Sequence, residues 1–402
     1  MGHVLEIDRL SKTMDAEAAR TGLPFPALPE IPAGRYTDAA HHALEVDALR
    51  RTWQFVLHDD ELPQPGSLRA LDHLGVPLLV VRDEAGTVRA FRNTCRHRGS
   101  QLVVEPCAQR EKLSCPIHGW TYRLDGRLAG VRDRRDFDEA DLTGRSLIGV
   151  RCESIGRLWF VNLDAAARAL VEDFGPLAEA WSLYRPGESR LVSRTTIRVD
   201  ANYKIVQEAN LEVYHVNSVH PAIVASLLDS SAAPITLLPN GHSIQAARLR
   251  KADFTEAAID LAPAPEASPV TGIANVAFNV FPSLVIATND WGYPLLCFRP
   301  VDVRTTDCEV IWIGHGPAQP DKAPVWDMIQ STFRTVLEQD FVFCPRTQAS
   351  LASGAIPGLL MGAQEKAIYH FHEEMDRRIG ADRMDPRLRV EPRLGAYVVN
   401  AF

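Results

Sequence analysis

Two short stretches decide how the first half of this chain folds: FRNTCRHRGSQLV at residues 91–103 and LSCPIHGWTYRLDG at residues 113–126. Each stretch contributes one cysteine and one histidine between strand-like runs, so we expect two loops of a β domain. The four candidate ligands are Cys95, His97, Cys115 and His118. Two thiolates and two imidazoles supplied in this way indicate a metal centre.

The grouping of these residues distinguishes between two kinds of metal centre. Common zinc sites pair Cys with Cys and His with His, whereas here each loop supplies one of each, as two loops around a [2Fe-2S] cluster would. Replacing two thiolates with neutral imidazoles raises the reduction potential of such a cluster. We therefore predict a [2Fe-2S] cluster that relays single electrons, with tetrahedral zinc as the alternative. Cys107 has no partner at ligand spacing and is interpreted as structural.

The pattern around these loops predicts the domain organisation. Short β-type runs separated by turn signals, such as VPLLVVRD and RLWFVNLD, indicate a small antiparallel β domain. An Ala-rich stretch that ends in Arg185-Pro186-Gly187 is typical of a linker. We predict an N-terminal arm at 1–45, a cluster domain at 46–165, a linker at 166–195 and a second domain at 196–402. Helices are expected near 43–55, 202–219 and 324–351.

A second chemical motif lies in NYKIVQEANLEVYHVNSVHP at residues 202–221. At about 100° per residue, Glu208, Glu212 and His215 fall within roughly 60° of one another on a helix. His220 does not share that face, because five residues correspond to about 140° around the helix axis. Both imidazoles can therefore bind one metal only if the helix ends or distorts between them.

The sequence contains a cause for such a break. Pro221 disfavours helical geometry at His220, and Asn217-Ser218 can cap or unwind the turn. Two imidazoles with one carboxylate form the facial triad of non-haem Fe(II) oxygenases, which leaves positions for O₂ and substrate. The alternative interpretation is a solvated helix that carries two acids and two incidental histidines.

Composition excludes several other classes of function. The chain has 402 residues and a net charge of -8, so nucleic acid or an anionic membrane is not expected as a partner. Seven cysteines are too few for a disulfide scaffold, and no apolar run is long enough for a membrane helix. We expect a cytoplasmic protein. No G-x-G-x-x-G fingerprint follows a strand, so NAD(P)H is expected to bind a separate reductase.

Both motifs resemble those of the Rieske non-haem iron oxygenase α subunits, the family of aromatic-ring-hydroxylating dioxygenases and carnitine-type monooxygenases. The resemblance extends from about Thr37 to Arg378. It implies an α+β fold, with a small antiparallel β Rieske domain and a larger helix-grip catalytic domain of antiparallel sheet and helices. It also implies a [2Fe-2S] cluster on the first motif and a mononuclear Fe(II) held by His215 and His220.

The resemblance assigns roles to the two acids of the second motif. In that family, the acid at the position of Glu212 bridges the mononuclear iron site to the second Rieske histidine, here His118, of a neighbouring subunit. This implies a homotrimer in which Glu212 connects the two centres. The position is usually Asp, and Glu occurs in relatives that act on quaternary amines. Glu208, the first acid of the motif, is the second candidate catalytic residue.

The third iron ligand must come from elsewhere in the chain. The family places it on a late helix, in a stretch that resembles VLEQDFVFCPRTQ, which nominates Asp340 and leaves Glu338 as the alternative. Pro345 removes an amide from this helix, so we expect a kink just after the ligand. His370 and His372 are interpreted as packing or surface residues.

The predicted function is that of a terminal oxygenase. Electrons from NAD(P)H would arrive through a separate reductase or ferredoxin, and O₂ would be used to hydroxylate or demethylate a small organic substrate. Loops at 222–271 and the aromatic residues Phe278, Phe281 and Trp291 are the pocket candidates. The alternatives are a cis-dihydroxylating dioxygenase, a pure Rieske electron carrier and a metal-stabilised binding protein.

Overall fold

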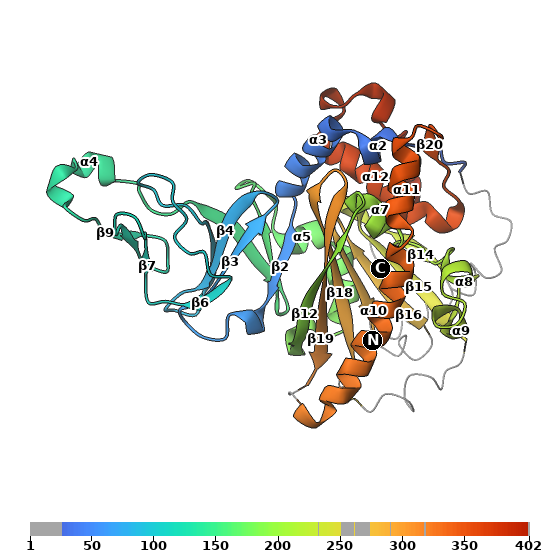
Figure 1. The fold of residues 1–402 in the computed structure, drawn as a ribbon, viewed down its shortest axis with the longest axis horizontal. Coiled ribbons are helices and arrows are strands. Elements are labelled where there is room, and N and C mark those ends of the chain that lie inside the picture. Colours follow the sequence, from blue (N-terminus) through green and yellow to red (C-terminus); the bar gives the residue numbers. More distant parts are fainter. Residues whose placement is uncertain are drawn as a thin grey trace. The chain divides into compact units, whose positions relative to one another are not determined.

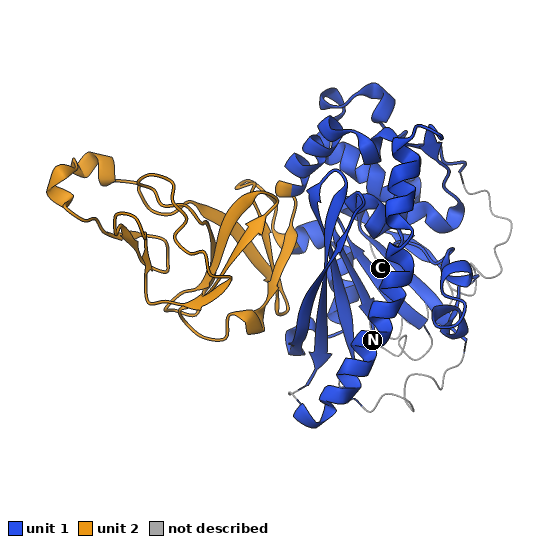
Figure 2. Ribbon diagram, viewed as in Figure 1, with its two compact units in different colours: residues 1–49, 171–402 blue, residues 50–170 orange. Residues whose placement is uncertain are grey.

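The structure is a computed structural model that describes residues 26–231, 233–250, 261, 274–289, 291–316 and 319–400. The chain divides into two compact units (Figure 2). One unit comprises residues 50–170, and the other combines residues 1–49 with residues 171–402. Each unit is built on its own large sheet, and all strand pairs in these two sheets are antiparallel.

The 50–170 unit contains a seven-stranded sheet in the order β2-β11-β10-β5-β4-β3-β6. Its strands are β2 Gln54–His58, β3 Ser67–His73, β4 Val76–Arg82, β5 Val88–Arg92, β6 Cys107–Gln109, β10 Gly149–Ile155 and β11 Leu158–Asn162. The apolar run of β4 buries four consecutive residues, 78–81, because both faces of this strand are covered. Asp83 closes the following turn by accepting the N–H groups of Ala85 and Thr87.

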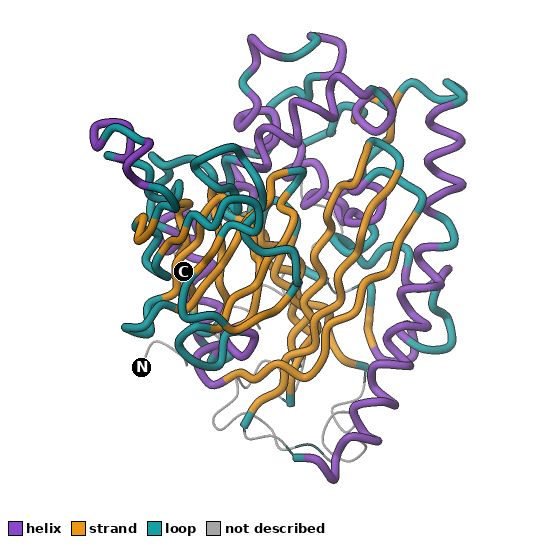
Figure 3. The backbone as a smooth tube through the Cα atoms, turned by 60° about the vertical axis from the view of Figure 1, so that its left-hand side comes forward, coloured by secondary structure: helices purple, strands orange, loops and turns teal. Residues whose placement is uncertain are grey.

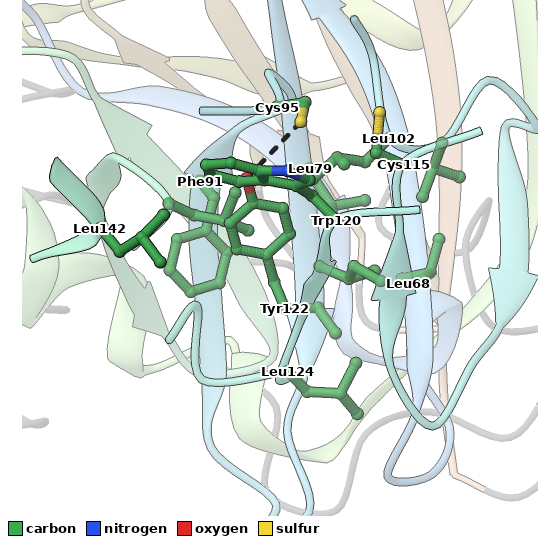
Figure 4. Close-up of a cluster of buried hydrophobic side chains, with 14 residues drawn as sticks. Leu68, Leu79, Phe91, Cys95, Leu102, Cys115, Trp120, Tyr122, Leu124 and Leu142 are labelled. Carbon is green, nitrogen blue, oxygen red and sulfur yellow. Dashed lines mark hydrogen bonds between the residues drawn. The ribbon is translucent and has the colours of Figure 1, made fainter. Parts of the chain in front are cut away.

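A smaller sheet in the same unit carries the second cysteine loop. Its strands are β7 Leu113–Ser114, β8 Thr121–Tyr122 and β9 Leu128–Gly130. Short helices η1 Asp59–Glu61, η2 Arg134–Asp136 and α4 Glu139–Leu142 complete the unit. One hydrophobic core includes Leu79 and Phe91 from the large sheet and Trp120, Tyr122 and Leu142 from around the small one (Figure 4). Both cysteine loops rest on this shared core.

The larger unit contains an eight-stranded sheet in the order β12-β19-β18-β17-β16-β15-β13, with β14 also paired to β15. Its strands are β12 Ser189–Val199, β13 Leu228–Asp229, β14 Ile235–Leu237, β15 Ser243–Leu249, β16 Ala274–Val280, β17 Leu284–Thr288, β18 Gly292–Asp302 and β19 Thr305–His315. A separate two-stranded sheet pairs β1 Ile31–Pro32 with β20 Gly358–Leu359. It joins the N-terminal segment to the C-terminal part of the chain.

Helices pack around this sheet. The α-helices are α2 Gly34–Thr37, α3 Ala39–Arg50, α5 Leu170–Phe174, α6 Pro176–Ser182, α7 Tyr203–Glu208, α8 Val216–Val219, α9 Val224–Leu227, α10 Ala323–Phe341, α11 Cys344–Ala352 and α12 Lys366–Ile379. Single 3₁₀ turns are η3 Pro186–Glu188, η4 Pro239–Gly241, η6 Pro320–Lys322, η7 Ala363–Glu365, η8 Ala381–Arg383, η9 Pro386–Leu388 and η10 Gly395–Tyr397. Within the described residues, no helix is both long and apolar enough to cross a bilayer.

Helix α10 covers one face of the eight-stranded sheet (Figure 1, Figure 3). Its N-terminal half is anchored by aromatic contacts, since Trp326 and Phe333 pack edge-on against Trp312 of β19 with ring centroids 6.0 and 5.3 Å apart. Asp340 follows Trp326 by 14 residues, so the helical rise places it about 21 Å farther along the axis. The far end of α10 therefore carries the predicted carboxylate ligand.

Three predicted elements need correction. The helix expected near 43–55 is α3, which ends at Arg50 and is followed by β2, because all five residues of β2 are buried in a sheet. The continuous helix expected over 202–219 is interrupted between α7 and α8. The predicted linker at 166–195 contains α5, α6 and the start of β12, because apolar residues such as Leu177 and Trp181 are fully buried.

Candidate metal centres

The two cysteine loops have the same backbone hydrogen bonds. In the first loop, the N–H of Cys95 donates to Ser100 O at 2.7 Å and Gly99 donates back to Cys95 O at 3.0 Å. In the second, Cys115 donates to Trp120 O at 2.8 Å and Gly119 donates back to Cys115 O at 3.0 Å. Both glycines have positive φ angles, +82° and +69°, which a side chain would disfavour. Each loop is therefore a tight turn that begins at its cysteine.

Both thiols are free and lie at one edge of the shared core (Figure 4). Cys95 and Cys115 are 2% and 4% exposed. The hydroxyl of Tyr122 lies 3.5 Å from the Cys95 Sγ and accepts the N–H of Arg96 at 2.9 Å. Burial raises the pKa of the Cys115 thiol, but the N–H groups of Ile117 and His118 outweigh burial, and the pKa falls below its usual value. Thiolate, the form that binds metals, is thereby favoured at Cys115.

The two loop histidines lie next to each other. The rings of His97 and His118 are 4.7 Å apart between centroids and nearly perpendicular, at 74°. His97 stacks on Trp120 at 4.9 Å, and Phe137 packs edge-on against both rings. The Nδ1 atom of His97 is buried and, among the described residues, has no hydrogen-bond partner. A buried nitrogen left without a partner in this way fits a metal ligand. The two loops bring together all four residues that a Rieske cluster needs.

A second cluster forms in the larger unit. One ligand atom from each of His215, His220 and Asp340 lies within 4.8 Å of the others. The Oδ1 atom of Asp340 is 2.8 Å from His220 Nε2 and 3.5 Å from His215 Nε2. The imidazole rings are 5.3 Å apart and inclined at 77°, so their Nε2 atoms converge on the carboxylate from different directions. This donor set fits the facial triad of a non-haem Fe(II) site.

The interrupted helix explains how two histidines five residues apart reach one point. His215 and His220 flank the four-residue helix α8, and His220 leaves helical geometry at φ −120° and ψ 47°, immediately before Pro221. Glu212 starts this turn, because its Oε2 accepts the backbone N–H groups of Tyr214 and, at 3.1 Å, of His215. A side chain that caps a new turn competes with continuation of the old helix. The capping residue is Glu212, a feature that the sequence pattern did not indicate.

Asp340 is the last residue but one of α10. Val342 and Phe343 separate α10 from α11, and Pro345 lies in the first turn of α11, so the kink occurs where the sequence places it. Burial raises the pKa of Asp340, opposed by His215 and His220. The alternative ligand, Glu338, points away: its side chain is 59% exposed and pairs with Arg334 at 2.9 Å.

The second ring nitrogen of each histidine is also held. Glu212 Oε1 lies 2.5 Å from His215 Nδ1, and Gln339 Oε1 lies 2.7 Å from His220 Nδ1. Burial lowers the pKa of His215, but the hydrogen bond and charge of Glu212 outweigh it, and the pKa lies above its usual value. The sequence analysis nominated Glu212 and missed Gln339. Its position next to Asp340 was the only available signal.

Glu208 does not lie on the iron-facing side as the helical projection predicts. Since α7 ends at Glu208, the angular relation to Glu212 and His215 is lost, and the Glu208 side chain is buried in a polar cluster. The Tyr36 hydroxyl donates to Glu208 Oε1 at 2.9 Å, and His372 Nε2 lies 2.9 Å from the same oxygen. Burial raises the pKa of Glu208 to about 8, against the lowering effect of Tyr36.

The late histidines are packing residues, but they are also hydrogen-bonded. His372 is fully buried, and its Nδ1 accepts a hydrogen bond from Arg35 Nε at 2.9 Å. Because arginine can only donate, the proton of a neutral His372 lies on Nε2 and is available to Glu208. His370 Nε2 pairs with Leu238 O at 2.8 Å. Neither histidine is part of the metal cluster of His215, His220 and Asp340.

The aromatic pocket candidates are core residues. Phe278 and Phe281 are each 1% exposed and pack against Tyr184 and Phe371. Trp291 packs against Trp326, at the end of α10 far from Asp340, so it does not line the iron site. Of the candidate loops at 222–271, residues 232, 251–260 and 262–271 lie outside the described residues.

Comparisons with known proteins agree with both centres. Residues 52–141 match the Rieske [2Fe-2S] domain family, and residues 187–381 match the family described as ring hydroxylating alpha subunit (catalytic domain). The glycine betaine monooxygenase oxygenase subunit of Chromohalobacter salexigens is 35% identical over 202 residues, 50% of this chain and 45% of that protein. The 2-aminobenzenesulfonate 2,3-dioxygenase subunit alpha of an Alcaligenes species is 32% identical over 199 residues, 48% of this chain and 50% of that protein.

The fold is also known from crystal structures. A structure of the quaternary ammonium Rieske monooxygenase CntA superposes with a TM-score of 0.75 at 21% identity, and the match covers 90% of this chain and 98% of that one. At this identity the likeness shows the fold. The chain spans about half the length of the curated relatives that it matches. With a Rieske domain followed by a ring-hydroxylating catalytic domain, the chain belongs to the family of Rieske non-haem iron oxygenase α subunits.

Proposed function

We propose that this chain is the oxygenase component of a multicomponent monooxygenase that hydroxylates or oxidatively demethylates a small quaternary ammonium compound. The observation that carries the proposal is the convergence of His215, His220 and Asp340, whose ligand atoms lie within 4.8 Å of one another. That donor set is the one used by non-haem Fe(II) oxygenases. The paired cysteine and histidine loops supply the second centre that such an enzyme needs.

The residues present fit both groups. Cys95, His97, Cys115 and His118 would hold the [2Fe-2S] cluster in the domain formed by residues 50–170. His215, His220 and Asp340 would hold Fe(II) in the other unit. Together the two groups would supply single-electron delivery and O₂ activation. Electrons would come from NAD(P)H through a separate reductase or ferredoxin.

Glu212 is the residue that we propose to connect the centres. Its carboxylate holds His215 through Nδ1, which fixes the ring so that Nε2 faces Asp340. We propose that the chain forms a homotrimer in which Glu212 also contacts His118 of a neighbouring copy. The exposed side chain of Tyr214 lies beside Glu212 in the sequence, so this turn reaches the protein surface. Glu208, by contrast, is proposed to act in positioning through its buried contacts.

The substrate proposal rests on the relatives and on Glu212. The oxygenase subunit of a glycine betaine monooxygenase and the CntA enzyme both act on quaternary ammonium compounds by name. Glutamate at the bridging position is the variant that the resemblance associates with such substrates. We also propose that the protein works in the cytoplasm, because all seven cysteines are free thiols in the structure.

Isotope labelling tests the type of reaction. The reconstituted protein, with a Rieske reductase and NADH, is supplied with ¹⁸O₂ and glycine betaine or carnitine. A monooxygenase incorporates one labelled atom and, where it removes a methyl group, releases formaldehyde. Incorporation of both atoms into an aromatic substrate, with no turnover of quaternary amines, would replace the proposal with a dioxygenase. A protein with two irons and no third would be an electron carrier, and one with zinc and no sulfide a binding protein.

A further inference from the structure

The two histidines of the iron site are held by chemically different groups. A carboxylate, Glu212, faces His215 Nδ1, whereas a neutral amide, Gln339, faces His220 Nδ1 at 2.7 Å. Both histidines direct their other nitrogen, Nε2, toward Asp340. A carboxylate can only accept a hydrogen bond, but an amide can accept through oxygen or donate through nitrogen. The orientation of the Gln339 amide therefore has a chemical consequence at His220.

Only one amide orientation leaves His220 able to bind a metal. If Gln339 Oε1 accepts, the ring proton of neutral His220 lies on Nδ1, and the Nε2 lone pair is free to face Asp340. If the amide nitrogen donates instead, the proton must lie on Nε2, which blocks it as a ligand. The structure has the oxygen within hydrogen-bond distance of Nδ1. This is the metal-binding arrangement.

We propose that Gln339 is a positioning residue that holds His220 in the Nδ1-protonated tautomer and so prepares Nε2 for the metal. The inference rests on the proposed function and concerns the same site. Gln339 and Asp340 are neighbours on α10, so one helix supplies both the carboxylate ligand and the group that orients the opposite histidine. His220 is 2% exposed, and little water can reach it to replace the amide.

The neutrality of Gln339 also sets the charge of the site. Asp340 and Glu212 already place two carboxylates around the histidines. A third carboxylate at position 339 would still accept the Nδ1 proton and would add negative charge near the cation. Gln339→Glu should therefore preserve the tautomer and strengthen metal binding, whereas Gln339→Leu should preserve the side-chain shape and remove the acceptor.

The test is Fe(II) affinity, measured by competition with a chromogenic chelator. The protein is stripped of mononuclear iron while the Rieske cluster is kept and checked by its EPR signal. Gln339→Leu should weaken Fe(II) binding about 10- to 100-fold, and Gln339→Glu should bind at least as tightly as the parent. Glu338→Gln is the matched control, because Glu338 neighbours Gln339 but is exposed and paired with Arg334; it should bind like the parent.

The outcomes separate this inference from the proposed function. If the parent binds Fe(II) and Gln339→Leu binds it equally well at an unchanged melting temperature, the role of Gln339 is wrong and the proposed function stands. If Gln339→Glu fails to restore binding that Gln339→Leu has lost, the tautomer argument is also wrong. If Gln339→Leu does not fold, Gln339→Met, of similar shape and without an amide, takes its place. A parent protein that binds no Fe(II) overturns both proposals.

Discussion

Hydrogen bonds to the side of a histidine that faces away from the metal decide how that ring binds. Glu212 makes such a bond to His215 and caps the turn that separates the two histidines, so one carboxylate has two tasks. The longer glutamate side chain reaches both its own backbone and the imidazole. The identity of the residue at position 212 therefore affects both the local chain path and the basicity of the ligand.

Removing the charge of Glu212 should separate these tasks. In Glu212→Gln, the amide oxygen can still hold Nδ1, so cluster and iron contents should remain near those of the parent. Electron transfer between the centres should slow about 10- to 100-fold, because the connecting group has lost its charge. Stopped-flow reoxidation of the pre-reduced cluster in the presence of substrate measures this rate. An unchanged rate would remove Glu212 from the electron-transfer path.

Glu208 supports a prediction about pH. Its folded-state pKa of about 8 lies above the ordinary value of about 4.3, so the folded state keeps a proton that the unfolded state has released. The Glu208 contribution to the free energy of unfolding is therefore fully present below about pH 4 and is lost as the pH rises through 8. Melting temperatures at pH 6 and pH 9 check this: any stability advantage of the parent over Glu208→Gln should shrink with rising pH. A difference that grows with pH would contradict the buried, proton-retaining state.

At the level of elements, the metal ligands lie where helices stop. His215 and His220 flank the short helix α8, and Asp340 lies at the end of α10 before the break at Val342 and Phe343. A continuous helix could not bring these residues together, since five residues turn the chain by about 140°. The breaks are part of the site, and Pro221 and Pro345 are visible in the sequence as their markers.

Pro345 provides a test of the second break. In Pro345→Ala the restored N–H can bond to the Phe341 carbonyl, so α10 can continue into α11 and displace Asp340. We expect iron content to fall several-fold while the melting temperature changes by only a few degrees. Pro324→Ala is the control, because Pro324 lies in the first turn of α10, where an N–H has no helical acceptor. Equal iron retention in both variants would show that the kink does not position Asp340.

The sequence was a good guide to the metal ligands and a weaker one to their surroundings. Spacing identified Cys95, His97, Cys115 and His118 because each loop closes on itself through local hydrogen bonds. Helical projection failed for Glu208, because a side chain 172 residues away, Tyr36, binds its carboxylate in the core. Contacts of this kind depend on tertiary packing, and a single sequence carries no local signal for them.

At the scale of the whole molecule, two compact units carry one centre each. If neighbouring copies exchange electrons, a chain without a cluster can still be served by the cluster of another copy. Co-expression of Cys95→Ser chains with His220→Ala chains should therefore restore turnover that neither variant has alone. Purified mixed oligomers checked by mass spectrometry give the measurement. Absence of turnover in assembled mixtures would indicate that each chain works by itself.

The central claim is that this chain holds a Rieske cluster and a separate mononuclear iron, and metal analysis combined with EPR tests it most directly. We predict about three irons and two inorganic sulfides per chain, with a Rieske-type signal after dithionite reduction. His220→Ala should keep the sulfides and the signal and lose about one iron. Protein without inorganic sulfide and without that signal would contradict the account.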